Sequence, residues 1–266
     1  MTMFALLRNS AFVVAAFGIG AGMVQADTLR LGTEGAYAPF NSVSESGELH
    51  GFDIDIGNAI CAELEATCEW STHDWGGIIP ALNSGKFDVL IASMAITEAR
   101  MEEVAFSDPY YFNTMRFAAL KDLGLEDATP ETLSGMVLGT QAGGVASKVL
   151  NQYFPDNDVK LYPKLGEAFL DMESGRLDLV LESKFALGDW MADGVDCCEF
   201  VGQDFLLDGT IGAGMAFRKD ETELRDRVNT ALASIIENGT YDEIRAKYFD
   251  FEIRDKPIAV SELFGQ

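Results

Sequence analysis

Arg100 is the residue whose type and position most clearly suggest chemistry in this chain. It follows an apolar run, residues 89–91, that is typical of a strand buried on both faces, and Thr97 is a candidate N-cap for a short helix carrying the arginine. A guanidinium is planar, charged and forked, so it can bind a carboxylate through two parallel hydrogen bonds. The pattern predicts a site for a small carboxylate. The alternative is a surface arginine paired with Glu98 or Glu102.

Two segments of the chain match each other position by position. Residues 84–93 read SGKFDVLIAS and residues 174–183 read SGRLDLVLES, and each follows a helical pattern. In both, glycine stands where a helix C-cap is expected, and a basic residue, an aspartate and a buried-type strand follow. The repeat predicts two similar α/β lobes. It also puts Ser93 and Ser183 at strand carboxyl ends, where open α/β sheets bind ligands.

The remaining elements fit the same two-lobed plan. Strands are predicted at residues 29–33 and 136–140, and helices at residues 53–64, 146–153 and 221–249, the last with a break at Asn238. Gly143 and Gly144 form a turn whose bare N–H groups favour an anion, although turn geometry alone could also require them. The chain is expected to cross between the lobes near residues 112–116 and 208–214. Two short crossings predict a hinge that closes over a solute.

The N-terminal sequence indicates an exported protein, and the overall charge limits its partners. Arg8, an apolar stretch at residues 11–23 and the sequence VQA at residues 24–26 are typical of a cleaved signal peptide, so the mature chain is expected to begin at Asp27. No later segment approaches the roughly 18 apolar residues of a membrane helix. The net charge of −24 argues against nucleic acid or anionic lipid as a partner.

The four cysteines of an exported chain are candidates for disulfides. Cys61 and Cys68 have a spacing that lets a disulfide tie the end of a helix to the next strand. Cys197 and Cys198 are adjacent, and they could pair with each other, remain thiols or bond to the first pair. Both histidines lie far from any CxxC spacing, so no zinc site is expected.

Five segments, taken in order, resemble the periplasmic amino-acid-binding proteins of ABC importers. They are GTEGAYAPF at Gly32, GFDIDIGNAIC at Gly51, DVLIASMAITEAR at Asp88, AFSDPYY at Ala105 and NGTYDEIRAKYF at Asn238. The resemblance is to solute-binding protein family 3, especially its members for lysine, arginine, ornithine, histidine and opines. It implies a type II fold, in which each lobe is a mainly parallel sheet flanked by helices and two strands form the hinge.

The resemblance also implies a domain plan and partners. A signal peptide at residues 1–26 would precede a first lobe made of residues 27–113 and 212–266, and residues 114–211 would form the second lobe. The protein would be a periplasmic monomer that binds a small amino-acid-like ligand and delivers it to an inner-membrane permease. Neither a cofactor nor a metal is implied.

The ligand contacts follow from the resemblance in the same way. An acid for the cationic end of a basic ligand and two aromatic rings for its alkyl stem correspond to Glu34, Tyr37 and Trp75. The α-ammonium is assigned to the backbone and hydroxyl at Ala92 and Ser93, and the α-carboxylate to Arg100.

Three positions depart from the family pattern. The family usually has Ser or Thr at Ala95, Thr at Gly144 and Asp at Ser183. A missing aspartate would leave the ligand's buried ammonium without its partner, and strand alternation predicts that the adjacent Glu182 points to the other face. The extra space favours a bulkier or N-substituted ligand, such as the opines octopine and nopaline, with Asn113 contacting the added group.

Two other functions remain open. One is binding of a neutral or polar amino acid. The other is a dehydratase-like enzyme on the same fold, which would need a general acid over its substrate. Glu34 is the carboxylate that the sequence places in the cleft, and a cationic ligand explains it with fewer assumptions. Because no Ser-His-Asp, HExxH or P-loop pattern is found, we expect a binding protein rather than an enzyme.

Overall fold

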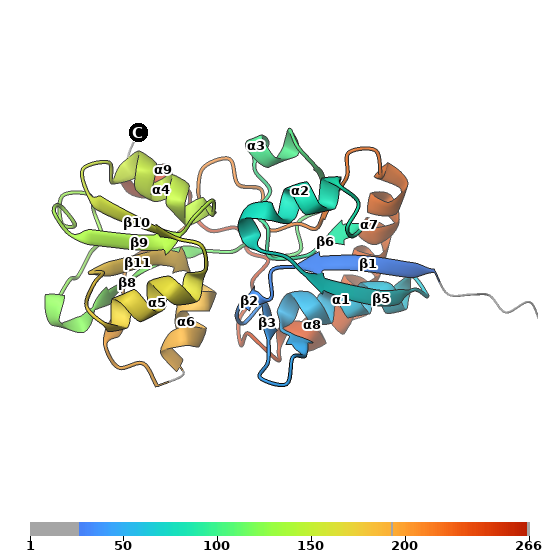
Figure 1. Ribbon diagram of the computed structural model, residues 1–266, viewed down its shortest axis with the longest axis horizontal. Coiled ribbons are helices and arrows are strands. Elements are labelled where there is room, and N and C mark those ends of the chain that lie inside the picture. Colours follow the sequence, from blue (N-terminus) through green and yellow to red (C-terminus); the bar gives the residue numbers. More distant parts are fainter. Residues whose placement is uncertain (1–26, 193, 265–266) are drawn as a thin grey trace, which may run out of the picture.

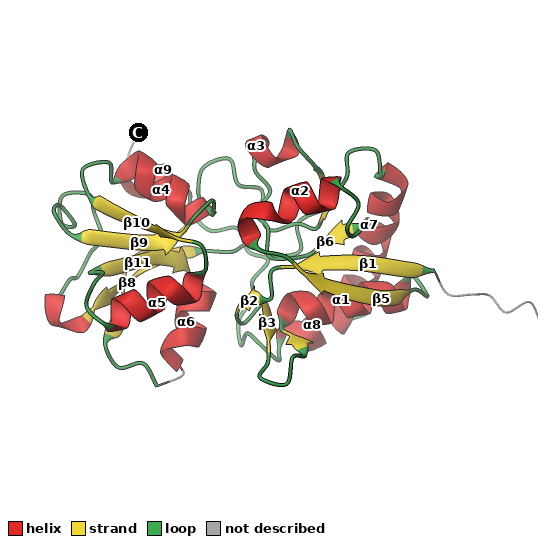
Figure 2. Cartoon of the chain, viewed as in Figure 1, coloured by secondary structure: helices red, strands yellow, loops and turns green. Residues whose placement is uncertain are grey.

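Two α/β lobes lie side by side, each built around its own five-stranded sheet (Figure 1; Figure 2). The structure is a computed structural model that describes residues 27–192 and 194–264, so the predicted signal peptide at residues 1–26 lies outside the described residues. The first lobe has strand order β5-β1-β6-β13-β7, and the second has β10-β9-β11-β8-β12. This arrangement confirms the predicted fold class.

The strands of the first lobe are β1 (Thr28–Thr33), β5 (Thr67–Thr72), β6 (Val89–Leu90), β7 (Ala105–Phe106) and β13 (Ala216–Phe217), with a small sheet of β2 (Ala36–Tyr37), β3 (Asn41–Val43) and β4 (Leu49–His50). Those of the second lobe are β8 (Met115–Leu120), β9 (Val137–Gln141), β10 (Asp158–Tyr162), β11 (Leu179–Ser183) and β12 (Cys198–Phe205).

Helices cover the sheets of both lobes (Figure 2). The first lobe carries α1 (Phe52–Glu63), α2 (Ile78–Asn83), α3 (Glu98–Met101), α7 (Thr222–Glu237) and α8 (Thr240–Arg245), and the second carries α4 (Val145–Tyr153), α5 (Leu165–Glu173), α6 (Lys184–Ala192) and α9 (Val260–Phe264). The two short 3-10 helices are η1 (Trp75–Gly77) and η2 (Lys121–Leu123). The predicted break at Asn238 separates α7 from α8.

The internal repeat of the sequence is reproduced in the two sheets. In each lobe three neighbouring strands are parallel, and the fourth strand runs antiparallel to both of its neighbours. The repeated segments form β6 and β11, which occupy the third place of their respective sheets. The antiparallel fourth strand, β13 or β8, is the strand that follows a crossing between lobes. Ser183 is the last residue of β11, whereas Ser93 follows the end of β6 by three residues.

The hinge contains the two predicted crossings and a third segment. At the hinge Tyr111 and Ala213 form an antiparallel bridge between the two crossings. Farther along, Phe112 N–H donates to the carbonyl of Ile253 (2.8 Å), and Leu206 forms a parallel bridge with Ala259. The chain thus returns once more toward the second lobe near its end.

Helix α9 packs on the second lobe, which differs from the predicted assignment of residues 212–266 to the first lobe. Val260 is fully buried in the apolar cluster that contains Phe117 and Phe154, and Phe264 contacts Phe154 with ring centroids 5.5 Å apart. Val260 and Phe264 are four residues apart, so a single helical face carries this contact. Residues 250–259 before it lack periodicity and gave no signal of the crossing. Apart from this helix, the division at residues 113/114 and 211/212 stays a proposal.

Both disulfides join cysteines that are close in sequence. Cys61 at the end of α1 is bonded to Cys68 in β5, with Cα atoms 5.9 Å apart, as predicted. Cys197 is bonded to Cys198, which is one of the pairings that the sequence left open.

Removing the Cys61–Cys68 disulfide should destabilise the protein moderately. A bridge that closes a loop of this length restricts the unfolded chain and contributes about 2 to 3 kcal/mol. We expect the variant Cys61→Ala/Cys68→Ala to unfold at lower denaturant, with a free energy of unfolding reduced by about that amount in guanidinium titrations. A loss below roughly 0.5 kcal/mol would contradict this account, since single surface changes already cause shifts of that size.

Candidate ligand-binding site

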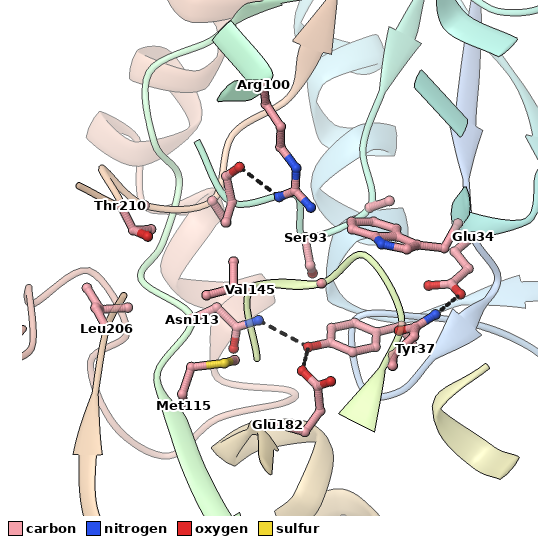
Figure 3. A pocket seen from close by; sticks show the side chains of 17 residues that line it. Glu34, Tyr37, Ser93, Arg100, Asn113, Met115, Val145, Glu182, Leu206 and Thr210 are labelled. Atoms are coloured by element: carbon pink, nitrogen blue, oxygen red, sulfur yellow. Dashed lines mark hydrogen bonds between the residues drawn. The ribbon is translucent and has the colours of Figure 1, made fainter. Parts of the chain in front are cut away.

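A pocket lies between the lobes, at the carboxyl ends of β1, β6, β9 and β11 (Figure 3). Its walls come from both lobes and from both crossings, and they comprise Glu34, Tyr37, Trp75, Ala92, Ser93, Ala95, Arg100, Asn113, Met115, Gln141, Gly144, Val145, Glu182, Leu206, Thr210, Gly212 and Ala213. Nine of the eleven residues predicted for the site are in this set; Gly143 and Ser183 are not. The roles of these nine toward a ligand stay predictions.

Arg100 reaches the pocket from the short helix α3. Thr97 caps this helix, because its hydroxyl accepts from the backbone N–H of Arg100 (3.4 Å). The guanidinium donates to the carbonyls of Ala95 (2.9 Å, Nη1) and Gly143 (3.3 Å, Nη2), and it lies over the Trp75 ring, 5.2 Å from the centroid. Two of its five N–H groups are used in these bonds, and three are left for a ligand.

The charge of Arg100 is buried and unpaired among the described residues. Only 9% of Arg100 is exposed, and the guanidinium forms no ion pair with Glu98 or Glu102, so the alternative of a surface ion pair is wrong. Burial lowers the pKa of Arg100 to about 10, which still leaves it charged at neutral pH. A buried cation without a counter-charge is unfavourable, so an anion that enters the pocket relieves a cost already present.

Glu34 stands in the loop after β1, on the side of the pocket opposite Leu206 in Figure 3. Its Oε1 accepts from Nε2 of Gln141 (2.6 Å), which belongs to the second lobe. Burial raises the pKa of Glu34 to about 7. A cation placed beside it would favour the ionised form, because opposite charges stabilise each other where little water enters.

Glu182 supplies a second carboxylate, contrary to the prediction that its side chain points away from the cleft. It lines the pocket, and only 5% of it is exposed. Its oxygens accept from the Tyr37 hydroxyl (3.1 Å), the Thr140 hydroxyl (3.3 Å) and the backbone N–H of Ser183 (2.9 Å). Burial raises the pKa of Glu182.

The error arose from the alternation rule. Strand β11 is buried along its whole length, so both of its faces are covered and alternation does not separate an inner from an outer side. Near the strand's end the long glutamate side chain bends toward the N–H of the next residue and reaches Tyr37. Ser183 is fully buried and donates its hydroxyl to Oδ1 of Asn113. A carboxylate of the second lobe therefore lines the pocket, one residue before Ser183.

A chain of hydrogen bonds connects the two lobes beneath the pocket. Ser183 donates to Oδ1 of Asn113. Nδ2 of Asn113 donates to the Tyr37 hydroxyl (3.2 Å), and that hydroxyl donates to Glu182 (Figure 3). This chain of hydrogen bonds, together with the Glu34–Gln141 bond, links the first lobe and the crossing near residue 113 to the second lobe. The described conformation thus has the lobes in contact across the pocket.

Several lining residues were not predicted. Gln141 ends β9 just before the glycine turn, so the strand-end rule that selected Ser93 could have selected it as well. Met115 and Val145 belong to apolar patterns that resemble core. Leu206 and Thr210 lie in the second crossing, where the sequence gave no signal that their side chains meet the pocket.

The described residues hold no group of three or more His, Cys, Asp or Glu side chains suited to a metal. Within the same residues, no helix is long and apolar enough to cross a membrane.

Residues 29–251 match the family model for bacterial extracellular solute-binding proteins, family 3. The chain belongs to this family. The lysine/arginine/ornithine-binding periplasmic protein of Escherichia coli K12 is 33% identical over 238 residues, 85% of this chain and 89% of that protein. The L-arginine-binding protein of Pseudomonas aeruginosa PAO1 is 35% identical over 232 residues, with coverage of 85% and 89%.

Solved structures give the same family. An ancestral arginine-binding protein bound to arginine superposes with a TM-score of 0.77 at 36% identity, and the match covers 84% of this chain and 98% of that one. The predicted resemblance to family 3 is thereby confirmed. All three of these relatives are binding proteins.

Proposed function

We propose that the protein captures a basic amino acid, such as arginine, lysine, ornithine or histidine, and delivers it to the permease of an ABC importer. The observation that carries this proposal is the charge pattern of the pocket. One buried cation, Arg100, faces two acids, the buried Glu182 and the partly buried Glu34. A basic amino acid has one carboxylate and two cationic groups, so each charge of the ligand has an opposite charge to meet. The binding proteins to which the chain is similar bear names of such ligands.

Each end of the ligand has a place in this arrangement. The α-carboxylate lies on the free N–H groups of Arg100, near the N-terminus of α4 at Gly144, where helix geometry favours anions. The α-ammonium lies between Ser93 and Glu182. The alkyl stem and distal cation lie between the rings of Tyr37 and Trp75 and reach Glu34. A micromolar dissociation constant corresponds to about −8 kcal/mol, which a few charge-assisted contacts can supply after entropy costs.

Delivery depends on the hinge. Tyr111 and Ala213 pair where the two crossings run together, so a rotation there moves one lobe relative to the other. The ligand adds contacts to both lobes at once, and it therefore favours the closed form over the open one. A permease that binds only the closed form would select the loaded protein.

An opine is the second candidate. Met115, Val145 and Leu206 form an apolar wall away from Glu34, and the buried hydroxyl of Thr210 beside them has no hydrogen-bond partner among the described residues (Figure 3). This wall could take an N-substituent. An opine's additional carboxylate, however, would want a second cation, and Arg100 is the one basic side chain among the described residues of the lining. A neutral amino acid would instead leave Glu34 unpaired.

A thermal-shift screen of the mature chain tests the proposal. We expect arginine, lysine, ornithine and histidine to raise the melting temperature more than glutamine does. If octopine or nopaline raised the melting temperature more than the basic amino acids do, an opine would be the ligand instead. Prephenate serves as the probe for the enzyme alternative, and its conversion to an absorbing product would overturn the binding function. A screen in which no basic amino acid changes the melting temperature would also overturn it.

A further inference from the structure

Asp53 is a fully buried carboxylate next to the pocket, outside the set of residues that line it. It lies in the first turn of α1 and is 0% exposed. Its Oδ2 accepts from the Ser93 hydroxyl (2.8 Å) and from Nδ2 of Asn41 (2.9 Å), and its Oδ1 accepts from the Tyr110 hydroxyl (2.6 Å). Three donors and the start of a helix stabilise its negative charge, although burial raises its pKa to about 6. At neutral pH the carboxylate is ionised.

The three donors come from three segments that surround the first-lobe half of the pocket. Asn41 belongs to β3, and its Oδ1 accepts from the backbone N–H of Gly35 (2.8 Å), in the loop that carries Glu34 and Tyr37. Tyr110 lies just before the first crossing and is fully buried. Asp53 is therefore the common anchor of the opening loop, the end of β6 and the approach to the hinge.

Ser93 is held in an unusual conformation at this contact. Its φ is 54°, in the left-handed region that residues other than glycine seldom adopt. This conformation persists only where the surroundings determine it, and here the hydroxyl is fixed on Asp53. A serine hydroxyl has one proton and two lone pairs. Because the proton is given to Asp53, only lone pairs remain for a ligand in the pocket.

We propose that Asp53 is a positioning residue that sets the ligand preference of Ser93. By taking the hydroxyl proton, Asp53 makes Ser93 an acceptor, and its charge makes that acceptor stronger. A ligand group that donates, such as an α-ammonium, is favoured there, and a group that only accepts is disfavoured. The proposal rests on the proposed function, because it concerns the ammonium of the same ligand.

Two probes separate this role from a merely structural one. L-Arginine carries the α-ammonium, and 5-guanidinopentanoic acid has the same carboxylate and guanidinium but a hydrogen in place of the ammonium. In calorimetric titrations of the mature chain, we expect Asp53→Asn to weaken arginine about tenfold and 5-guanidinopentanoic acid less than threefold. A structural role would weaken both probes by the same factor, and that result would overturn the proposal.

The matched control removes a carboxylate from the same helix without touching the pocket. Asp55 lies two residues further along α1, where it accepts from Lys247 (2.9 Å) and Tyr248 (3.2 Å). Asp55→Asn should leave both affinities within twofold of the unsubstituted protein. If it reproduced the arginine-specific loss, the effect would belong to the charge of the helix in general, and the role assigned to Asp53 would be wrong.

A second variant keeps the test decisive if Asp53→Asn does not fold. Ser93→Ala deletes only the hydroxyl, so the preference for arginine over 5-guanidinopentanoic acid should fall about tenfold; an unchanged preference would overturn the proposal. Where both variants fold, Asp53→Asn should add less than a threefold loss in the Ser93→Ala background, because it acts through the missing hydroxyl. Failure of every basic amino acid to bind the unsubstituted protein would instead contradict the proposed function itself.

Discussion

Arg100→Ala is expected to abolish amino-acid binding, with the loss of the ligand-induced rise in melting temperature. Arg100 is the one basic residue among the described residues that line the pocket, and only 9% of it is exposed. Removing it would leave the ligand's carboxylate in a buried site without a partner, which costs about 2 to 5 kcal/mol, or roughly 30-fold to several thousand-fold in affinity. The measurement is a calorimetric titration with arginine, supported by the thermal shift.

Two further variants define what the loss means. Arg100→Lys keeps the charge but not the forked geometry, so we expect an intermediate affinity. Arg225→Ala removes an arginine that pairs with Asp226 on the surface, and it should bind like the unsubstituted protein. The free protein should not be destabilised by more than about 1 kcal/mol in Arg100→Ala, because the change also removes an unpaired buried charge. If Arg100→Ala still bound arginine, the ligand's carboxylate would not be bound by Arg100.

Glu34→Gln is expected to have the second-largest effect, and the effect should depend on pH. The pKa of Glu34 is about 7 in the free protein, so a proton must leave before the carboxylate can pair with a cation. Below pH 7 the affinity for arginine should fall by up to about tenfold per pH unit, and above it the affinity should level off. In Glu34→Gln the affinity for arginine should be low at every pH. The part of its pH dependence that comes from the titration of Glu34 should vanish. Calorimetry between pH 5.5 and 8.5 measures both.

The same carboxyl group affects the stability of the free protein in the opposite sense. Its pKa in the unfolded chain is near 4.5, below the folded value of about 7, so the folded state holds more protons between these values. The free energy of unfolding should therefore decrease as the pH rises through this window, and less steeply in Glu34→Gln. If the affinity for arginine depended on pH equally in the unsubstituted protein and in Glu34→Gln, Glu34 would not face the ligand's cation.

The parts of the site that the sequence predicted are those in which local chemistry dictates geometry. A threonine cap, a short helix and an arginine after a buried strand define Arg100 almost completely. The repeat of SGKFDVLIAS and SGRLDLVLES identified β6 and β11 as equivalent strands, because the same pattern of cap, charge and apolar run specifies the same unit in both lobes.

The parts that the sequence missed depend on contacts between distant segments. Glu182 was assigned to the wrong face because alternation is informative only when one face of a strand meets solvent, and β11 is covered on both. Thr210 and Leu206 reach the pocket from a crossing whose path only the packed lobes determine. Helix α9 docks on the second lobe through Val260 and Phe264, which resemble any short apolar pair.

The position of Glu182 changes which ligand is expected. With Ser183 in place of an aspartate, the sequence suggested a site without a partner for the α-ammonium, and hence an N-substituted ligand. Glu182 lies in the pocket and bonds to Tyr37 and Thr140, so a carboxylate is present after all. Glu182 therefore favours an unmodified basic amino acid, and only the apolar wall near Met115 and Leu206 favours an opine.

The most direct test of the central claim is a calorimetric comparison of L-arginine with L-citrulline at pH 8. Citrulline has nearly the shape of arginine and the same α-amino and α-carboxyl groups, but its side chain is uncharged. If Glu34 is matched to the distal cation of the ligand, arginine should bind at least about 30-fold more tightly, a difference of roughly 2 kcal/mol. Equal affinities would contradict the account, because Glu34 would then have no part in choosing the ligand.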